Sequence, residues 1–158
     1  MRHSLWQSFQ FAGRGVRHAL RTQRTMRIHI ALALSVTVAL FWLDLPAAEA
    51  AALVLSMAGV LAAELMNTAV EVLVDLHVGD QYHVLAGRAK DLSAAGVLVA
   101  ALGAAMVGAL VLGRPLAAAV GGRLESQFLG RAGVLVLVLA LVLMVLRGNR
   151  QSEGGPGQ

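Results

Sequence analysis

Three long apolar stretches constrain the fold of this chain more than any other feature. They run from about Ile28 to Leu45, from about Ala47 to beyond Val74, and from about Leu85 to Leu112. A helix of about 20 apolar residues crosses a hydrocarbon layer of roughly 30 Å, and a helix also satisfies its own backbone hydrogen bonds there. With 58% hydrophobic and 14% charged residues, the chain has fewer charges than the roughly one quarter of a soluble domain. We therefore predict an all-α integral membrane protein.

The N-terminal residues 1–27 are predicted to form a cytoplasmic amphipathic arm. From Ser4 to Arg21, apolar residues such as Trp6 and Phe9 recur at steps of three and four, while arginines fall on the opposite side. This pattern is typical of a helix that lies in the membrane surface with its arginines facing lipid phosphates. A basic segment beside a membrane span sets topology more often than it binds nucleic acid, so we expect no nucleic-acid partner.

The arginines of the arm also predict the topology, because positive charge stays in the cytoplasm. We expect a three-helix membrane domain at 28–113, in a multi-pass protein of the inner (cytoplasmic) membrane with its N-terminus inside. The second span, about 47–77, is longer than a bilayer requires, so its last turns should project into water. The helix is expected to break at Gly113 to Pro115. The remaining segments are predicted to be an external loop at 114–127, an additional fourth C-terminal transmembrane helix at 128–147 and a disordered tail at 148–158.

Polar residues interrupt the second apolar stretch at Glu64, Asn67, Glu71 and Asp75. At about 100° per residue Glu71 and Asp75 each fall within roughly 20° of Glu64 around a helix, and the amide lies about 60° from Glu64. Charged groups are costly inside a membrane unless they are paired or functional. The spacing therefore predicts one polar cleft, in which Glu64 lies about 16 Å deeper than Asp75.

Lys90 and Asp91 open the third stretch, close to the same cytoplasmic edge. Carboxylates facing a lysine suit a polyphosphate with Mg²⁺, since this ion binds one or two carboxylates together with phosphate oxygens. Phosphoryl transfer needs mainly positioning and charge neutralisation. The sequence has no Gly-x-x-x-x-Gly-Lys loop, so a nucleotide site must be built between helices. Two alternatives remain: the acids could be interhelical ion pairs, or Glu64 could serve as a proton relay in a small ion- or proton-coupled transporter.

The motifs in this region are similar to those of a known family. The matching residues are Glu64-Leu65-Met66-Asn67-Thr68-Ala69-Val70-Glu71, Val74-Asp75, Tyr82-His83 and Ala89-Lys90-Asp91-Leu92-Ser93-Ala94-Ala95. Over about Phe9 to Leu112 the chain resembles the prokaryotic diacylglycerol kinase family, which includes the undecaprenol kinases. Its arm, with Phe11 to Gly15 and Arg24 to His29, resembles the undecaprenol kinase branch. The resemblance implies a homotrimer of three-span subunits that share active sites at the cytoplasmic surface.

The resemblance also implies residue roles. Glu64 would orient or deprotonate the hydroxyl of a membrane lipid alcohol, and Glu71 would bind Mg²⁺. ATP binding is expected at Asn67, Glu71, Tyr82, His83, Lys90 and Asp91, with Asp75 in a supporting role. The arm favours undecaprenol as the acceptor and undecaprenyl phosphate as the product, with diacylglycerol and phosphatidic acid as the alternative.

The chain departs from the family pattern at Gln23. The family usually has a glutamate there, which shares the metal with Glu71, whereas an amide coordinates Mg²⁺ without adding charge. The resemblance therefore implies a weaker metal site that still includes Gln23, a site in which another acid replaces the missing carboxylate, or a catalytically impaired scaffold. The loop between Asp75 and Lys90 is also one residue longer than usual, and the fourth span is outside the family pattern.

Overall fold

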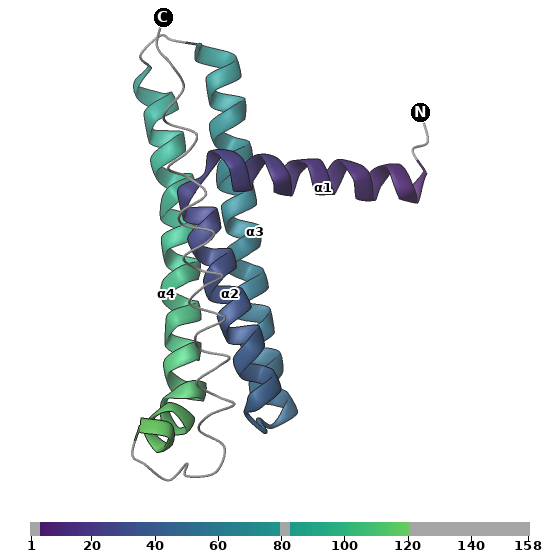
Figure 1. Ribbon diagram of the computed structural model, residues 1–158. Coiled ribbons are helices and arrows are strands. Elements are labelled where there is room, and N and C mark those ends of the chain that lie inside the picture. Colours follow the sequence, from purple (N-terminus) through teal and green to yellow (C-terminus); the bar gives the residue numbers. More distant parts are fainter. Residues whose placement is uncertain (1–3, 80–82, 121–158) are drawn as a thin grey trace, which may run out of the picture.

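The computed structural model describes residues 4–79 and 83–120 of the 158-residue chain. Within these ranges the protein is all helical, as predicted, and has no strand (Figure 1). The helices are α1 (Leu5–Thr22), α2 (Arg24–Trp42), α3 (Ala47–Val78) and α4 (Val84–Val120). The predicted fourth span at 128–147 lies outside the described residues, as does the tail.

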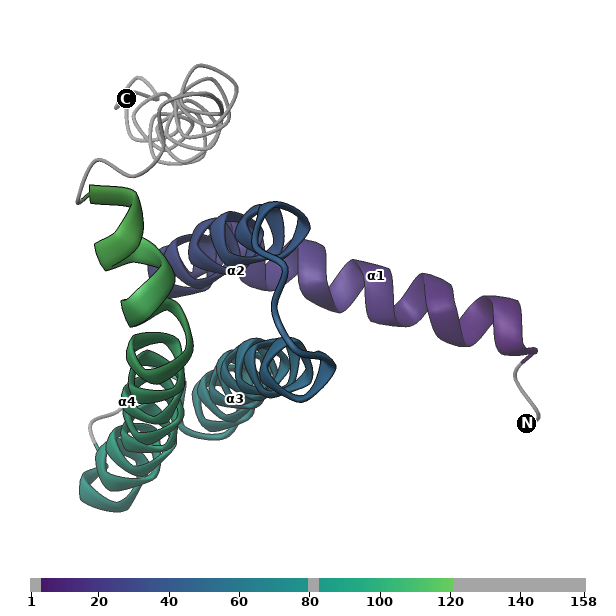
Figure 2. The same ribbon diagram turned by 90° about the horizontal axis from the view of Figure 1, so that it is seen from below.

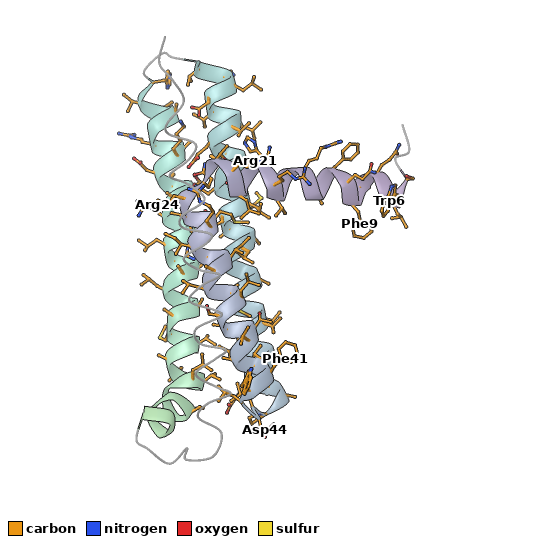
Figure 3. All side chains as sticks on the ribbon, viewed as in Figure 1. Trp6, Phe9, Arg21, Arg24, Phe41 and Asp44 are labelled. Atoms are coloured by element: carbon orange, nitrogen blue, oxygen red, sulfur yellow. The ribbon has the colours of Figure 1, made fainter. Side chains whose placement is uncertain are left out.

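Helix α1 is the amphipathic helix that the arm predicts. It begins with a capping box, in which the Ser4 hydroxyl accepts from the Gln7 backbone N–H at 3.3 Å and the Gln7 side chain accepts from the Ser4 N–H at 2.9 Å. The helix extends sideways from the bundle formed by the other three (Figures 1 and 2). Phe9 points toward the end of the bundle where Phe41 lies, and Arg21 points the opposite way (Figure 3). This arrangement suits a helix resting on a membrane surface.

Three helices are long and apolar enough to cross a membrane: α2, α3 and the Val84–Gly113 part of α4. Helix α2 has 19 residues and is therefore about 28 Å long, close to the thickness of a hydrocarbon core. The aromatic side chains of Phe41 and Trp42 are exposed at its far end, as in an interfacial belt (Figure 3). Helices α3 and α4 continue past the level of α1 (Figure 1), so the last turns of α3 project beyond the surface helix, as the sequence predicts.

Helix α3 is the centre of the helix bundle, because it packs against α1, α2 and α4. The described residues of α2 and α4 do not pack directly against each other. The buried apolar core is small and includes Met26 on α2, Leu53 and Val60 on α3, and Val97 on α4. Most large apolar side chains are exposed instead, as expected where lipid tails are as apolar as the side chains.

The end of α4 differs from the prediction. A helix break was expected at Gly113 to Pro115, followed by a loop from residue 114, but α4 runs on to Val120 with Pro115 inside it. A proline in a helix interior removes one hydrogen bond and clashes with the preceding turn, which kinks the helix without having to end it. The last turns of α4 indeed turn aside from the axis of the rest (Figure 1). Residues 114–120 are therefore helical, and the remainder of the predicted loop lies outside the described residues.

Candidate active site

Glu64 is the most enclosed polar side chain of the site, with 1% of its surface exposed. It lies in the middle of α3 and faces α2. Its Oε2 accepts a hydrogen bond from the Thr25 hydroxyl at 3.2 Å, and its Oε1 lies 3.2 Å from His29 Nε2. No hydrogen bond joins these two atoms, and Oε1 has no hydrogen-bond donor among the described residues. A buried carboxylate oxygen without a donor is costly, and this makes Glu64 a candidate for chemistry.

A second cluster surrounds Glu71, two turns nearer the C-terminal end of α3. Its Oε2 accepts from Gln23 Nε2 at 2.5 Å, and its Oε1 accepts from Asn67 Nδ2 at 2.9 Å. Asn67 in turn accepts from the Ser93 hydroxyl of α4 at 2.6 Å through its Oδ1. Gln23 occupies the junction between α1 and α2. The cluster therefore joins that junction to α3 and α4 through one chain of hydrogen bonds.

Asp75 and Lys90 form a third group, at the projecting ends of α3 and α4. Lys90 Nζ donates to Asp75 Oδ1 at 2.5 Å, although both side chains are well exposed, at 39% and 60%. The Lys90 carbonyl oxygen lies 2.9 Å from the Ser93 hydroxyl and is the alternative acceptor for the proton that this group donates to Asn67. One turn of α4 thus carries both the lysine and the serine that reaches Asn67.

A cavity of about 550 Å³ lies beside this third group, between the end of α3 and the beginning of α4. Its lining includes Val74 and His77 from α3, His83 from the connection and Leu85 from α4. His83 and Asp91 are both exposed. Tyr82, the remaining residue expected at an ATP site, lies outside the described residues.

The four polar residues of α3 do not share one set of partners, as a single cleft would require. Glu64 contacts α2, Asn67 and Glu71 connect to the α1–α2 junction and α4, and Asp75 contacts α4. Because Glu64 precedes Glu71 by seven residues, the two carboxylates are separated by about 10 Å along the helix. The helical spacing correctly indicates a common side of α3, but the neighbouring helices divide that side into three groups.

The sequence interpretation missed Thr25, His29 and Ser93 as members of the site. A signal for them was available: Thr25 and His29 are four residues apart and so share one face of α2, and Ser93 follows Lys90 by three. Each lies within a motif quoted for the resemblance, but nothing in the sequence alone indicates that these side chains meet Glu64 or Asn67.

The donor set around Glu71 fits a magnesium ion that is carried by a nucleotide. It offers one carboxylate and two side-chain amides, and Mg²⁺ commonly binds one or two carboxylates and completes its shell with phosphate oxygens and water. Within residues 4–79 and 83–120 no group of three or more His, Cys, Asp or Glu residues could hold a metal by itself. The residues therefore suit a metal ion that arrives with a nucleotide and is bound partly by its phosphates better than an ion held by protein side chains alone.

Fold and site together define a class: a multi-pass helical membrane protein with a surface helix and a polar site that extends from the buried part of α3 to its projecting end. The model of the family described as prokaryotic diacylglycerol kinase matches residues 10–112, which include all three groups of the site. The chain belongs to the prokaryotic diacylglycerol kinase family, and it is a membrane lipid kinase.

Individual relatives agree with this assignment. The chain is 43% identical to a diacylglycerol kinase of Synechocystis over 73% of its own length and 70% of that protein. It is 38% identical to the undecaprenol kinase of Bacillus subtilis, over 67% of its length and 85% of the relative. It is 35% identical to the diacylglycerol kinase of Escherichia coli K12, over 65% and 83%.

Proposed function

We propose that the protein transfers the γ-phosphoryl group of ATP to diacylglycerol and so forms phosphatidic acid. The relatives from Synechocystis and Escherichia coli that carry this activity in their names support diacylglycerol, which the sequence interpretation had ranked second. The structural observation that carries the proposal is Glu64, a carboxylate enclosed in a membrane-spanning helix with one oxygen unbonded among the described residues. Such a group suits a base for a lipid hydroxyl.

Undecaprenol is the second candidate acceptor. It is favoured by the resemblance of the arm to the undecaprenol kinase branch and by the 38% identity to the Bacillus subtilis enzyme, of which the chain covers 85%. Both acceptors present a hydroxyl at the end of a long apolar tail. The proposed chemistry at Glu64 is therefore the same for both, and the acceptor must be determined by assay.

In the proposed reaction, Glu64 orients the lipid hydroxyl and accepts its proton. The hydroxyl oxygen bonds to the γ-phosphorus of ATP as the bond from that phosphorus to the bridging oxygen breaks, and ADP leaves. When bound, Mg²⁺ neutralises phosphate charge. Glu71, with the amides of Asn67 and Gln23, would hold it, and Gln23 would have to release its hydrogen bond to Glu71.

The projecting ends of α3 and α4 form the proposed ATP site. Lys90 would exchange Asp75 for a phosphate oxygen, a substitution that leaves the ammonium group paired. The cavity beside it, at about 550 Å³, has a volume typical of small-molecule sites, and His83 on its wall would contact the nucleotide. Tyr82 and Asp91 complete the proposed set. An exposed ammonium group next to apolar side chains suits a nucleotide, which has both phosphates and an aromatic nucleobase.

The proposed assembly is a homotrimer with its N-terminus in the cytoplasm and with shared active sites. The arginines of α1 support this orientation. Open space around the small residues of α4 supports close association with another helix: a Cβ added at Gly96, Gly103 or Gly108 would have no neighbour within 4 Å. Mass measurement of the protein in a native lipid environment tests the trimer, and a monomer with full activity would contradict it.

The acceptor is tested with purified protein in lipid bilayers, radiolabelled ATP, Mg²⁺ and either dioleoylglycerol or undecaprenol. The expected result is labelled phosphatidic acid, with slower or no labelling of undecaprenol. Preferential labelling of undecaprenol would replace the first candidate by the second. If neither lipid is labelled, the proposal that the protein phosphorylates a lipid alcohol is overturned, and the transporter or scaffold alternatives are favoured.

A further inference from the structure

Helix α2 supplies both side chains that hold the buried carboxylate of Glu64. Thr25 donates to Oε2 and His29 Nε2 lies beside Oε1, each at 3.2 Å. These two residues are four apart, so they lie one above the other on the face of α2 that packs against α3. The Thr68 hydroxyl, which is also near Glu64, donates to the backbone carbonyl of Glu64 at 2.9 Å and leaves the carboxylate to α2.

His29 is the one basic side chain close to the Glu64 carboxylate among the described residues. A carboxylate that is 1% exposed has little contact with solvent, so its orientation depends on the side chains packed around it. Among the described residues the only other contact between an acidic and a basic side chain joins Lys90 to Asp75, at the far end of α3. Arg24 and Arg27 of α2 form no ion pair with a described residue, and α4 contributes no titratable partner to Glu64. Thr25 and His29 are therefore the side chains available to hold this carboxylate.

We propose that His29 and Thr25 are positioning residues for Glu64: Thr25 fixes the direction of Oε2, and His29 holds Oε1 from the same face of α2. This proposal rests on the proposed function, in which Glu64 receives the hydroxyl proton. The proton passes from the alcohol oxygen to the carboxylate while that oxygen bonds to the γ-phosphorus and ADP departs. A carboxylate can accept this proton only when one of its oxygens lies within hydrogen-bond reach of the hydroxyl, so the two side chains of α2 determine how well Glu64 is aligned for the transfer.

The variant His29→Ala tests the contact at Oε1. Alanine has no group that reaches the carboxylate, so Glu64 is held less firmly and kcat should fall by about tenfold or more. His29→Gln places an N–H donor near Oε1 and should retain more activity than His29→Ala. KM for ATP should change less than about twofold, since neither residue contacts the Glu71 or Lys90 groups.

Two matched controls accompany this variant. His18→Gln removes an exposed imidazole of α1 and should leave kcat unchanged. Thr25→Val should lower kcat while Thr25→Ser retains it. The control for this pair is Thr37→Val on the same helix, whose hydroxyl donates only to the Ala33 carbonyl at 2.8 Å.

The outcomes separate this proposal from the proposed function. A wild-type protein that is inactive with both lipids overturns the proposed function. If the wild type is active and Glu64→Gln is not, a wild-type kcat in His29→Ala overturns the role of His29, as does a KM for ATP that changes as much as kcat. If His29→Ala does not give a cooperative thermal transition, the threonine pair decides, and equal activity of Thr25→Val and Thr25→Ser contradicts positioning by α2.

Discussion

Two contacts between acidic and basic side chains in the described part of the chain, at opposite ends of the site, have very different surroundings. Glu64 and His29 meet between α2 and α3, where the carboxylate is almost fully enclosed. Lys90 and Asp75 meet at the projecting ends of α3 and α4, where both side chains are well exposed. A buried pair leaves an expensive charge behind when one partner is removed, whereas an exposed pair contributes little to stability. The comparison indicates that the buried pair is fixed by the fold and that the exposed pair is free to exchange partners with a ligand.

The largest effect is expected at the buried end. Glu64→Gln keeps the size of the side chain but removes the base, so kcat for lipid phosphorylation should fall by at least about 100-fold. Glu49→Gln is a matched control, because Glu49 is an exposed glutamate in the first turn of the same helix. The assay is transfer of labelled phosphate to dioleoylglycerol. A Glu64→Gln protein with more than a tenth of the wild-type rate would show that the enclosed carboxylate is not the base.

The next effect is expected at Glu71, between the two ion pairs. Glu71→Gln removes the only carboxylate of its cluster, so the concentration of Mg²⁺ that gives half-maximal activity should rise by about tenfold or more. A Mg²⁺ titration at saturating ATP measures this change. An unchanged requirement, together with reduced kcat, would place the metal away from Glu71.

A smaller effect is expected at Gln23, and it is opposite in direction: Gln23→Glu should strengthen Mg²⁺ binding, whereas Glu71→Gln weakens it. In Gln23→Glu, two carboxylates would meet where an amide now donates to Glu71 at 2.5 Å, and like charges at this distance disfavour the folded state unless a cation lies between them. The melting temperature should fall in EDTA and rise on addition of Mg²⁺ by more than in the wild type. Gln10→Glu, at an exposed position of α1, is the control. Equal Mg²⁺-dependent shifts in the two proteins would exclude position 23 from the metal site.

The smallest effect on stability is expected at the exposed end. Lys90→Gln should change the free energy of unfolding by less than about 1 kcal/mol, because the pair with Asp75 is open to solvent. Its effect should instead be seen in binding, with KM for ATP raised by about tenfold through the loss of one charge-assisted contact. Denaturant unfolding and steady-state kinetics measure the two quantities. A large loss of stability with an unchanged KM for ATP would show that the exposed pair stabilises the fold and does not bind the nucleotide.

Much of the architecture follows from the sequence. The lengths of the apolar stretches predict the three membrane helices, and the period of the arm from Ser4 to Arg21 predicts α1, since both depend on local geometry. Pro115 shows the limit of such rules: a proline that predicts a helix end instead lies within α4, because a kink also relieves its steric clash.

The chemistry of the site was only partly accessible from the sequence. The spacing of Glu64, Glu71 and Asp75 determines that they share one side of α3, and their residue types indicate phosphate and metal chemistry. Which neighbour each one meets depends on how α2 and α4 are rotated and shifted against α3, and helix periodicity contains no information about that packing. Only the tertiary structure assigns His29 to Glu64 and Gln23 to Glu71, since these contacts arise between helices that are far apart in the chain.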